Sequence, residues 1–274
     1  MLEYSKAFHV TTEERASFLE FAVAISRKAG AAALSFFRSR TGMTNKLSDG
    51  SYDPVTEADL AVERILREAI ELHYPLHGIC GEEYGFRRGN GLTWVIDPID
   101  GTRAFISGLL HWGILLSLFD GQRPILGVMY QPYTDELFFG EGNNSTLQYS
   151  GNSQKLCTSA QTNIEDAVVG TTSHRFFGET NFLNGFQRLE ESARFTSYSG
   201  DCYLYAMLAS GQIDIAVDTG LQPYDIQALI PIVEGAGGSV TSENGGNASL
   251  GGTVVATANT ALHRKVLRIF SESS

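Results

Sequence analysis

The chain has 274 residues, of which 43% are hydrophobic and 19% charged, as is usual for a folded globular protein. Its 31 acidic residues outnumber its 20 basic residues, which gives a formal net charge of −11. Such an acidic chain is not expected to bind nucleic acid or an anionic membrane as its main partner.

Three cysteines, Cys80, Cys157 and Cys202, lie far apart and form no CxxC pair, so neither a zinc ribbon nor a disulfide framework is predicted. The segment 1–10 lacks the apolar run of a secretory signal, and the longest apolar stretches are too short to cross a bilayer. The simplest interpretation of these features is a reducing, cytoplasmic setting.

A long helix is predicted over 11–37, where apolar residues recur at helical spacing after the capping-box pair Thr11 and Glu14. The polar, turn-rich segment 41–53 is expected to form a loop. A second amphipathic helix is predicted over 56–74.

The middle of the chain changes to short apolar runs separated by turn residues, which predicts strands. The expected strands are Ile79–Cys80, Thr93–Ile96, and a meander of Ile114–Phe119, Ile125–Tyr130 and Glu136–Phe139. Residues 140–155 are rich in Gly, Asn and Ser and are expected to form a loop. We expect this loop to join two halves of one domain, approximately 1–145 and 155–274.

Strands and helices continue to alternate in the remainder of the chain. The expected strands are Val168–Thr171, Ile213–Val217 and Thr253–Ala256, and the expected helices are 180–191, Cys202–Ala209, Ile226–Val233 and Ala261–Phe270. The alternation lacks the regular beat of a doubly wound fold, so the predicted class is a layered α/β (α+β) sandwich.

Two aspartates directly follow an apolar strand in the segment 94–102 (WVIDPIDGT). Burial of Asp97 and Asp100 beside the core is costly, and a bound cation would offset that cost. Magnesium suits such hard oxygen ligands. Pro98 bends the chain, so that the Ile99 carbonyl could join both carboxylates around the ions.

The same motif ends with Gly101 and Thr102. Gly101 allows close access to the backbone, and Thr102 stands where a helix is expected to start. Exposed N–H groups at a helix start favour an anion such as phosphate. The segment therefore predicts a place where metal ions and a phosphate group meet.

Three further acidic segments show similar placement. Glu82 and Glu83 follow a short apolar strand, Asp225 begins an apolar helix, and Asp59 lies in a helix start over 53–59. Each of them alone also has an ordinary structural explanation, as a helix cap or as a solvated turn.

Taken together, five motifs resemble the inositol monophosphatase family, in the same order and along nearly the whole chain. The family pattern combines Thr-x-x-Asp at a helix start, GEE, WxxDPxDGT, a late Asp before an apolar helix, and GAGG. In this chain these motifs are Thr56 to Asp59, Gly81 to Glu83, Trp94 to Thr102, Asp225, and Gly235 to Gly238. The family often has Trp before the late Asp, and this chain has Tyr224, which keeps the aromatic ring.

The resemblance implies a magnesium-dependent phosphatase with a sugar-phosphatase-like αβαβα architecture, and a role for each matching position. The ligands of two or three magnesium ions would be Glu82, Asp97, the Ile99 carbonyl, Asp100 and Asp225. Asp59 and Thr102 would orient the attacking water and help to deprotonate it, with Glu82 assisting. The backbone of Gly101 and Thr102 would hold the phosphate.

The residues after the core motif suggest which phosphate monoester is the substrate. The segment 103–108 (RAFISG) is similar to the histidinol-phosphate phosphatase branch of the family, whereas inositol phosphatases commonly carry Thr-Asn-Phe there. The segments 200–203 (GDCY) and 221–225 (LQPYD) indicate the same branch. The resemblance therefore implies a role in histidine biosynthesis.

Histidinol phosphate carries an ammonium group and an imidazole. Asp201 and Asp218 lie where family members contact the part of the substrate beyond the phosphate, and carboxylates there would attract a cationic amine. A helix cap and a solvated strand end are the structural alternatives for these two residues. Arg103 could hold a carboxylate in position, touch the phosphate, or be a plain surface residue.

Two other functions stay open on the sequence. The same metals and fold would serve an inositol monophosphatase or a 3′-nucleotide phosphatase. A function of a different class is a non-catalytic regulator that keeps the metal site. The sequence argues against it, because no proposed ligand is missing. The family resemblance also suggests a homodimer.

Overall fold

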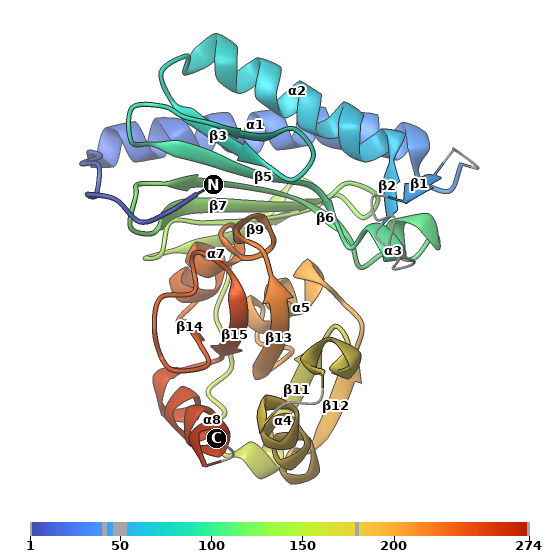
Figure 1. The fold of residues 1–274 in the computed structure, drawn as a ribbon, viewed down its shortest axis with the longest axis vertical. Helices are drawn as coiled ribbons and strands as arrows, with labels where there is room; N and C mark the ends of the chain where they lie inside the picture. The colour runs from blue at the N-terminus through green and yellow to red at the C-terminus, as the bar shows by residue number, and fades with distance from the viewer. Residues whose placement is uncertain (1, 40–42, 46–53, 179–180, 273–274) are drawn as a thin grey trace.

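The computed structural model describes residues 2–39, 43–45, 54–178 and 181–272 (Figure 1). It contains two large β-sheets with helices between them. The larger sheet has eight strands in the order β10-β9-β8-β7-β6-β5-β3-β4, and only β3 and β5 pair in parallel. Its strands are β3 Gly78–Gly81, β4 Gly85–Arg87, β5 Thr93–Asp100, β6 Gly113–Phe119, β7 Pro124–Gln131, β8 Glu136–Gly140, β9 Ser145–Tyr149 and β10 Asn152–Lys155.

Two long helices, α1 Thr12–Phe36 and α2 Glu57–His73, cover one face of this sheet. Both begin with a capping box, in which the N-cap threonine and an acidic residue three positions later exchange hydrogen bonds. Their apolar faces and the facing strands form one core cluster that includes Trp94 and Trp112, both fully buried. Burial of this apolar surface holds the first two layers together.

The second sheet has five strands in the order β12-β11-β13-β15-β14. The strands are β11 Val168–Thr171, β12 Phe195–Tyr198, β13 Ile215–Leu221, β14 Ser239–Ser242 and β15 Gly252–Thr257. β11 pairs in parallel with β12 and β13, whereas β15 pairs antiparallel with β13 and β14.

Helices α5 Cys202–Ala209, α6 Pro223–Ile226 and α7 Leu229–Gly235 lie between the two sheets. They share a core cluster with Leu115 and Met129 of the larger sheet and with Val254 and Ala256 of the smaller one. The outer face of the smaller sheet packs on α4 Asn181–Ser192 and α8 Thr260–Ser271 in a separate cluster. The layers therefore follow the predicted order αβαβα.

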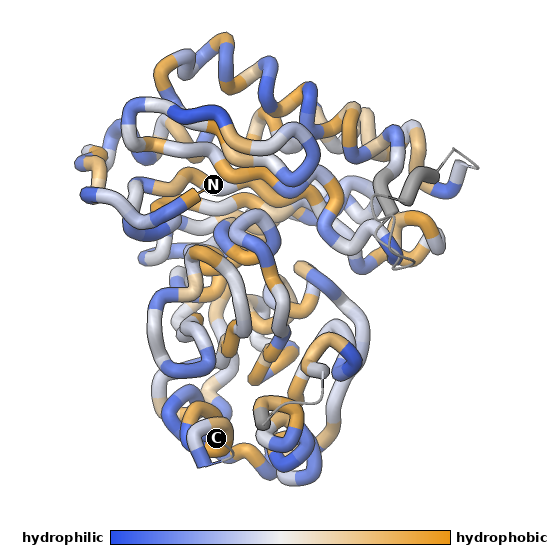
Figure 2. The backbone as a smooth tube through the Cα atoms, in the orientation of Figure 1, coloured by the Kyte–Doolittle hydropathy of each residue, from blue (hydrophilic) through white to orange (hydrophobic). Residues whose placement is uncertain are grey.

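Figure 2 shows the same division as a hydropathy pattern, with hydrophobic backbone along the central strands of the larger sheet. Both β6 and β7 are buried at every position, because helices cover both faces of these strands. Among the described residues, no helix combines the length and apolar character that a bilayer crossing requires. All three cysteines are free thiols.

Some predicted elements differ from the structure. The loop expected over 140–155 contains β9 and β10, which extend the larger sheet. The single helix expected over 226–233 is instead the pair α6 and α7, and β4, β12 and β14 were not predicted. The helix start expected at Thr102 is confirmed by the short helix α3 Thr102–Ile106. The loop expected over 41–53 lies mostly outside the described residues, but 43–45 form β1, which pairs with β2 Pro54–Thr56.

Candidate active site

The carboxyl end of β5 carries the acidic core motif. The register between β5 and β6 shifts between Asp97 and Asp100, which bends the strand there. Asp97 Oδ1 accepts a hydrogen bond from the Ile99 N–H at 3.1 Å, so the side chain itself stabilises the bend. Gly101 then adopts φ 80° as the N-cap of α3. A Cβ at this position would lie 2.7 Å from the His111 carbonyl oxygen, so glycine is required by both conformation and space.

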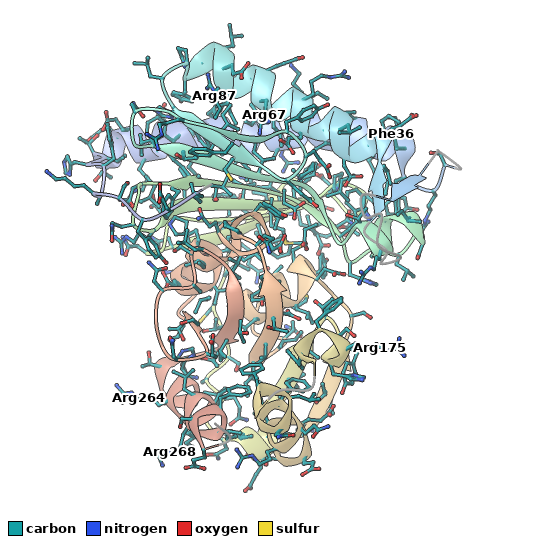
Figure 3. The ribbon with its side chains drawn as sticks, in the orientation of Figure 1. Phe36, Arg67, Arg87, Arg175, Arg264 and Arg268 are labelled. Carbon is teal, nitrogen blue, oxygen red and sulfur yellow. The ribbon has the colours of Figure 1, made fainter. Side chains whose placement is uncertain are left out.

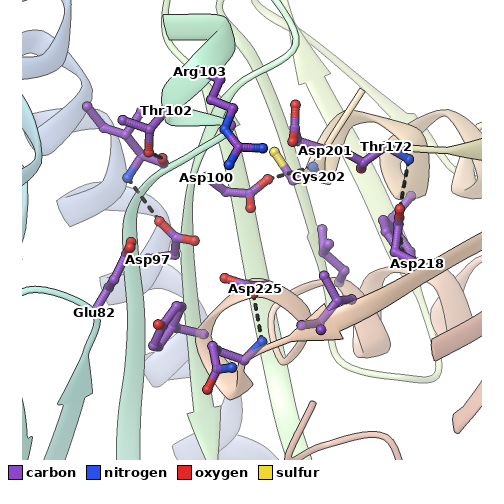
Figure 4. Close-up of a pocket in the computed structure, with 18 of the residues that line it drawn as sticks. Glu82, Asp97, Asp100, Thr102, Arg103, Thr172, Asp201, Cys202, Asp218 and Asp225 are labelled. Atoms are coloured by element: carbon purple, nitrogen blue, oxygen red, sulfur yellow. Dashed lines mark hydrogen bonds between the residues drawn. The ribbon is translucent and has the colours of Figure 1, made fainter. Parts of the chain in front are cut away.

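A third carboxylate reaches this strand end from α6, one of the helices between the two sheets. Carboxylate oxygens of Asp97, Asp100 and Asp225 all lie within 4.8 Å of one another, and Figure 4 shows the three side chains pointing toward one another. Asp225 is held in the first turn of α6 because its Oδ2 accepts the Gln222 N–H at 2.7 Å. Asp100 Oδ2 accepts the Cys202 N–H at 2.6 Å.

Burial and mutual repulsion raise the pKa values of this cluster. Burial raises the pKa of Asp100 to about 7, and the charge of Asp225 contributes to the same direction. Burial also raises the pKa of Asp225 to about 7, with Glu82 adding to the effect. The pKa of Asp97 rises well above its usual value for the same reasons. At neutral pH the cluster therefore favours any cation that can replace its protons.

The donor set fits a hard divalent cation. Besides the three aspartates, the half-buried Glu82 and the Ile99 backbone line the same cavity. The Cys202 thiol also lines it, but burial and the charge of Asp100 raise its pKa well above the usual value, so the sulfur stays protonated. A site with several carboxylate oxygens and no thiolate suits magnesium better than zinc.

Asp59 lies on α2, next to this cluster but not among the residues that line the cavity. Its Oδ2 accepts from the Thr56 N–H at 2.8 Å and from the Thr56 hydroxyl at 2.5 Å. Its Oδ1 is buried and has no hydrogen-bond partner within the described part of the chain. Burial raises the pKa of Asp59 to about 6, and the nearby charge of Glu82 adds to this shift.

Thr102 is the first residue of α3, and its hydroxyl donates to the Ile99 carbonyl at 3.0 Å. The first N–H groups of a helix have no partner within the helix, so they can bind an anion. Thr102 and Gly101 both line the cavity, beside the carboxylate cluster.

The cavity has a volume of about 420 Å³, enough for a small phosphorylated molecule. Its far end contains Asp218, one of the other two predicted aspartates (Figure 4). Asp218 is fully enclosed and accepts hydrogen bonds from the Thr172 N–H at 2.7 Å and from the Thr171 and Tyr205 hydroxyls at 3.2 Å. Burial raises its pKa to about 6.

Asp201 stands between the two ends of the cavity. It precedes α5 with a positive φ of 45°, a backbone conformation that residues other than glycine rarely adopt. Burial raises its pKa to about 8, and the charges of Asp100 and Asp218 act in the same direction, whereas Arg103 lowers it. Arg103 also lines the cavity, so the structure brings the predicted substrate contacts together.

Sequence reasoning missed Phe176, which lines the cavity from the 3₁₀ helix η2 His174–Phe177. Its ring is 44% exposed, and the Arg103 guanidinium lies 5.3 Å from the ring centroid. It also missed the cavity residues Thr172 and Tyr205, which hold Asp218. None of these three stands in a motif or a periodic element boundary that points to a site, so only the fold reveals them.

Comparison with known proteins places this site in a family. A sequence profile described as the inositol monophosphatase family matches residues 14–274. The chloroplastic bifunctional phosphatase IMPL2 of Arabidopsis thaliana is 35% identical over 225 residues, which are 81% of this chain but only 63% of that longer protein. A histidinol-phosphatase of Chlorobaculum parvum is 32% identical over 250 residues, which cover 91% of this chain and 95% of that protein.

A solved structure gives the same assignment. An inositol monophosphatase from Zymomonas mobilis superimposes with a TM-score of 0.83 at 32% sequence identity, over 96% of this chain and all of that one. The chain therefore belongs to the inositol monophosphatase family, a family of phosphoric monoester hydrolases.

Proposed function

We propose that the protein is a magnesium-dependent phosphatase that hydrolyses histidinol phosphate to histidinol and inorganic phosphate. One observation carries this proposal: a single cavity has a carboxylate cluster suited to metal ions at one end, and beyond it two further acids, the half-buried Asp201 and the buried Asp218. The first end fits a phosphate bound through cations, and the region beyond it fits a cationic amine.

The residues that would hold magnesium are Glu82, Asp97, the Ile99 carbonyl, Asp100 and Asp225. When bound, magnesium supplies the positive charge that the phosphate and the developing oxyanion require. Without cations these carboxylates would repel the phosphate, which itself carries nearly two negative charges.

The chain's own groups can orient and activate the attacking water. The Thr102 hydroxyl donates its proton to the Ile99 carbonyl, so its oxygen lone pairs are left to accept a hydrogen bond from water. The free Oδ1 of Asp59 can accept a proton, because a pKa of about 6 leaves this carboxylate mostly ionised at neutral pH and still basic. Glu82 would assist, since its charge contributes to that raised pKa.

The far end of the cavity matches the leaving group. The ammonium group of histidinol phosphate would pair with the Asp218 carboxylate and favour loss of the proton from Asp201, whose pKa of about 8 keeps it mostly protonated at neutral pH in the empty cavity. The neutral hydroxyl groups of an inositol gain much less from these two acids. Phe176 offers an aromatic face to a cation or to the imidazole ring. Relatives named histidinol-phosphatase share this length and family, which supports the same substrate.

Turnover on a panel of phosphate monoesters tests the proposal. Phosphate release would be measured on histidinol phosphate, inositol 1-phosphate and adenosine 3′,5′-bisphosphate, each with magnesium and with a chelator. We expect magnesium-dependent release with kcat/KM highest for histidinol phosphate. A higher value for inositol phosphate would favour the second candidate function, which relatives named inositol monophosphatase support, and no release at all would favour a non-catalytic role.

A cytoplasmic homodimer in histidine biosynthesis is the accompanying proposal for the cellular setting, and it rests on the family resemblance. Light scattering on the purified protein checks the dimer, for which a mass near twice 29.8 kDa is expected.

A further inference from the structure

Glu82 lies in the short turn that joins β3 to β4. Glu82 follows β3 directly, and β4 begins only three residues later at Gly85. The Glu82 N–H donates to the Ile96 carbonyl oxygen of β5 across 3.3 Å, which is long for a backbone hydrogen bond. The contacts that the rest of the turn makes with α2 therefore also bear on the position of Glu82.

Glu63 supplies such contacts from helix α2. Its carboxylate is 0% exposed, and Oε2 accepts the Glu83 N–H at 2.7 Å. Oε1 accepts the Tyr84 N–H at 3.1 Å and the Arg67 Nε–H at 2.6 Å. A buried carboxylate with these partners fixes two consecutive backbone groups immediately after Glu82.

Gly81 shows how closely the carboxylate approaches the turn. A Cβ built at Gly81 would lie 1.9 Å from Glu63 Oε1 and 2.4 Å from its carboxylate carbon. No larger residue fits at this position unless Glu63 moves. The Glu63 carboxylate therefore packs directly against the backbone of Gly81, the residue just before Glu82.

Arg67 extends the same contact to the far end of the turn. Its guanidinium donates to the Gly85 carbonyl and lies 5.8 Å from the Tyr84 ring centroid. Glu63 and Arg67 are one helical turn apart on α2, where Figure 3 labels Arg67. Together they fasten the turn 82–85 to α2 at three backbone groups.

Helix α2 also carries Asp59, one turn before Glu63 on the same face. We propose that Glu63 is a positioning residue: it holds the Glu82 turn on α2, so that the Glu82 carboxylate is placed for metal binding in a fixed relation to Asp59. Glu63 itself does not line the cavity. The inference rests on the proposed metal site and assigns a role to a residue that touches neither substrate nor ions.

Magnesium binding to the metal-free protein, measured by isothermal titration calorimetry without substrate, tests the inference. In Glu63→Gln one acceptor oxygen becomes an NH₂ group that faces N–H donors, so the turn loosens. We expect a magnesium Kd about 10-fold to 100-fold higher than in the wild type, the range typical for residues that support metal ligands. With magnesium raised to saturation, KM for histidinol phosphate should stay within about twofold of the wild type, since metal support is restored by mass action.

Glu71→Gln is the matched control. Glu71 lies on the same helix, is 49% exposed and makes only a long ion pair of 3.9 Å with Arg87. This variant should bind magnesium as the wild type does. Arg67→Lys is the second test variant, because its ammonium cannot contact both Glu63 and the Gly85 carbonyl, and its side chain is partly exposed, at 13%. A roughly three- to tenfold higher Kd is expected there.

Outcomes separate this inference from the proposed function. Wild-type magnesium affinity in folded Glu63→Gln or, if that variant does not fold, in folded Arg67→Lys would overturn the positioning role and leave the phosphatase proposal standing. If Glu71→Gln raised the magnesium Kd as much as Glu63→Gln does, the positioning role would be overturned as well. Failure of the wild type to bind magnesium would remove both.

Discussion

At the scale of single residues, the site is a set of acids that the apoprotein buries against their preference. Burial and mutual repulsion bring the pKa values of Asp100 and Asp225 to about 7. Each aspartate accepts one backbone N–H, which a neutral Asn could also do, so this structural role does not require three acids together. The cost makes sense when the carboxylates serve a cation.

Replacement of Asp97 by Asn separates function from stability at this position. We expect kcat/KM for magnesium-dependent phosphate release to fall by more than about 100-fold, since a metal ligand is lost. The metal-free variant should melt at a higher temperature than the metal-free wild type, because one buried negative charge is removed from the cluster. Phosphate release and calorimetric melting are the two measurements. Unchanged release would take Asp97 out of the mechanism.

Replacement of Phe176 by Leu tests recognition of the leaving group. Loss of the aromatic face should raise KM for histidinol phosphate about threefold to tenfold, which corresponds to about 1 kcal/mol. The KM for inositol 1-phosphate should change little, because a polyol gains little from an aromatic ring. Equal effects on both substrates would show that the ring only supports Arg103, whose guanidinium lies over it.

At the scale of elements, the start of α2 joins fold to chemistry. The Thr56 side chain caps the helix and also bonds Asp59, so one capping box both starts the helix and leaves a single oxygen of Asp59 free. The same device opens α1 at Thr11, far from the cavity.

The two capping boxes form a matched pair of variants. Thr56→Ala and Thr11→Ala should each lower the free energy of unfolding by about 1 kcal/mol. Only Thr56→Ala should also lower kcat, because Asp59 loses the hydroxyl that orients it. Denaturant melts and steady-state kinetics check both effects. A parallel loss of activity in Thr11→Ala would indicate general destabilisation instead.

Elements with a strong local signal could be predicted from the sequence, and exposed or short ones could not. The helices α1 and α2 have periodic apolar faces and capping boxes, and the central strands are continuous apolar runs. By contrast, β10 is exposed at every position and β9 is mostly half-buried, so neither shows the alternation that reveals a strand. The pairing of β9 with β8, and of β10 with β9, decides their conformation.

The candidate site shows the same limit. The acids Asp97 and Asp100, three positions apart, indicate a site on their own, because two carboxylates come at the end of one apolar strand. That Asp225 joins them could be expected only from the resemblance to the family, since α6 lies on the other side of a long stretch of chain. Phe176 has no motif and required the structure.

In the whole molecule, the layers bring residues from both large sheets and from the helices between them to one cavity. Glu82, Asp97 and Asp100 come from the larger sheet, whereas Asp225 and Asp218 come from α6 and β13. The division into halves near 145–155 remains a prediction. The acids that gather there should affect the stability of the entire fold.

The pH dependence of melting follows from these raised pKa values. An unfolded aspartate releases its proton near pH 4, but folded Asp100 and Asp225 keep theirs until about pH 7. The folded apoprotein therefore holds more protons than the unfolded chain over this window, so the cluster lowers stability as the pH rises from about 4 to about 7. In metal-free protein, the Tm of the wild type minus that of Asp100→Asn should become more negative by several degrees over this window.

Magnesium should reverse this trend. Because the ion binds the deprotonated carboxylates, the increase in Tm that it causes should be larger at pH 8 than at pH 6. Differential scanning calorimetry with and without the ion measures both effects. If the increase in Tm caused by magnesium were the same at pH 6 and pH 8, these carboxylates would not be protonated in the folded metal-free protein.

If acids from distant parts of the chain form one metal site, manganese should bind there, since it takes similar oxygen ligands. Diffraction from crystals soaked in manganese, which scatters anomalously, locates the ion. We expect anomalous peaks among Glu82, Asp97, the Ile99 carbonyl, Asp100 and Asp225. Ordered crystals in which these side chains bind no ion, or in which manganese lies elsewhere, would contradict a shared metal site.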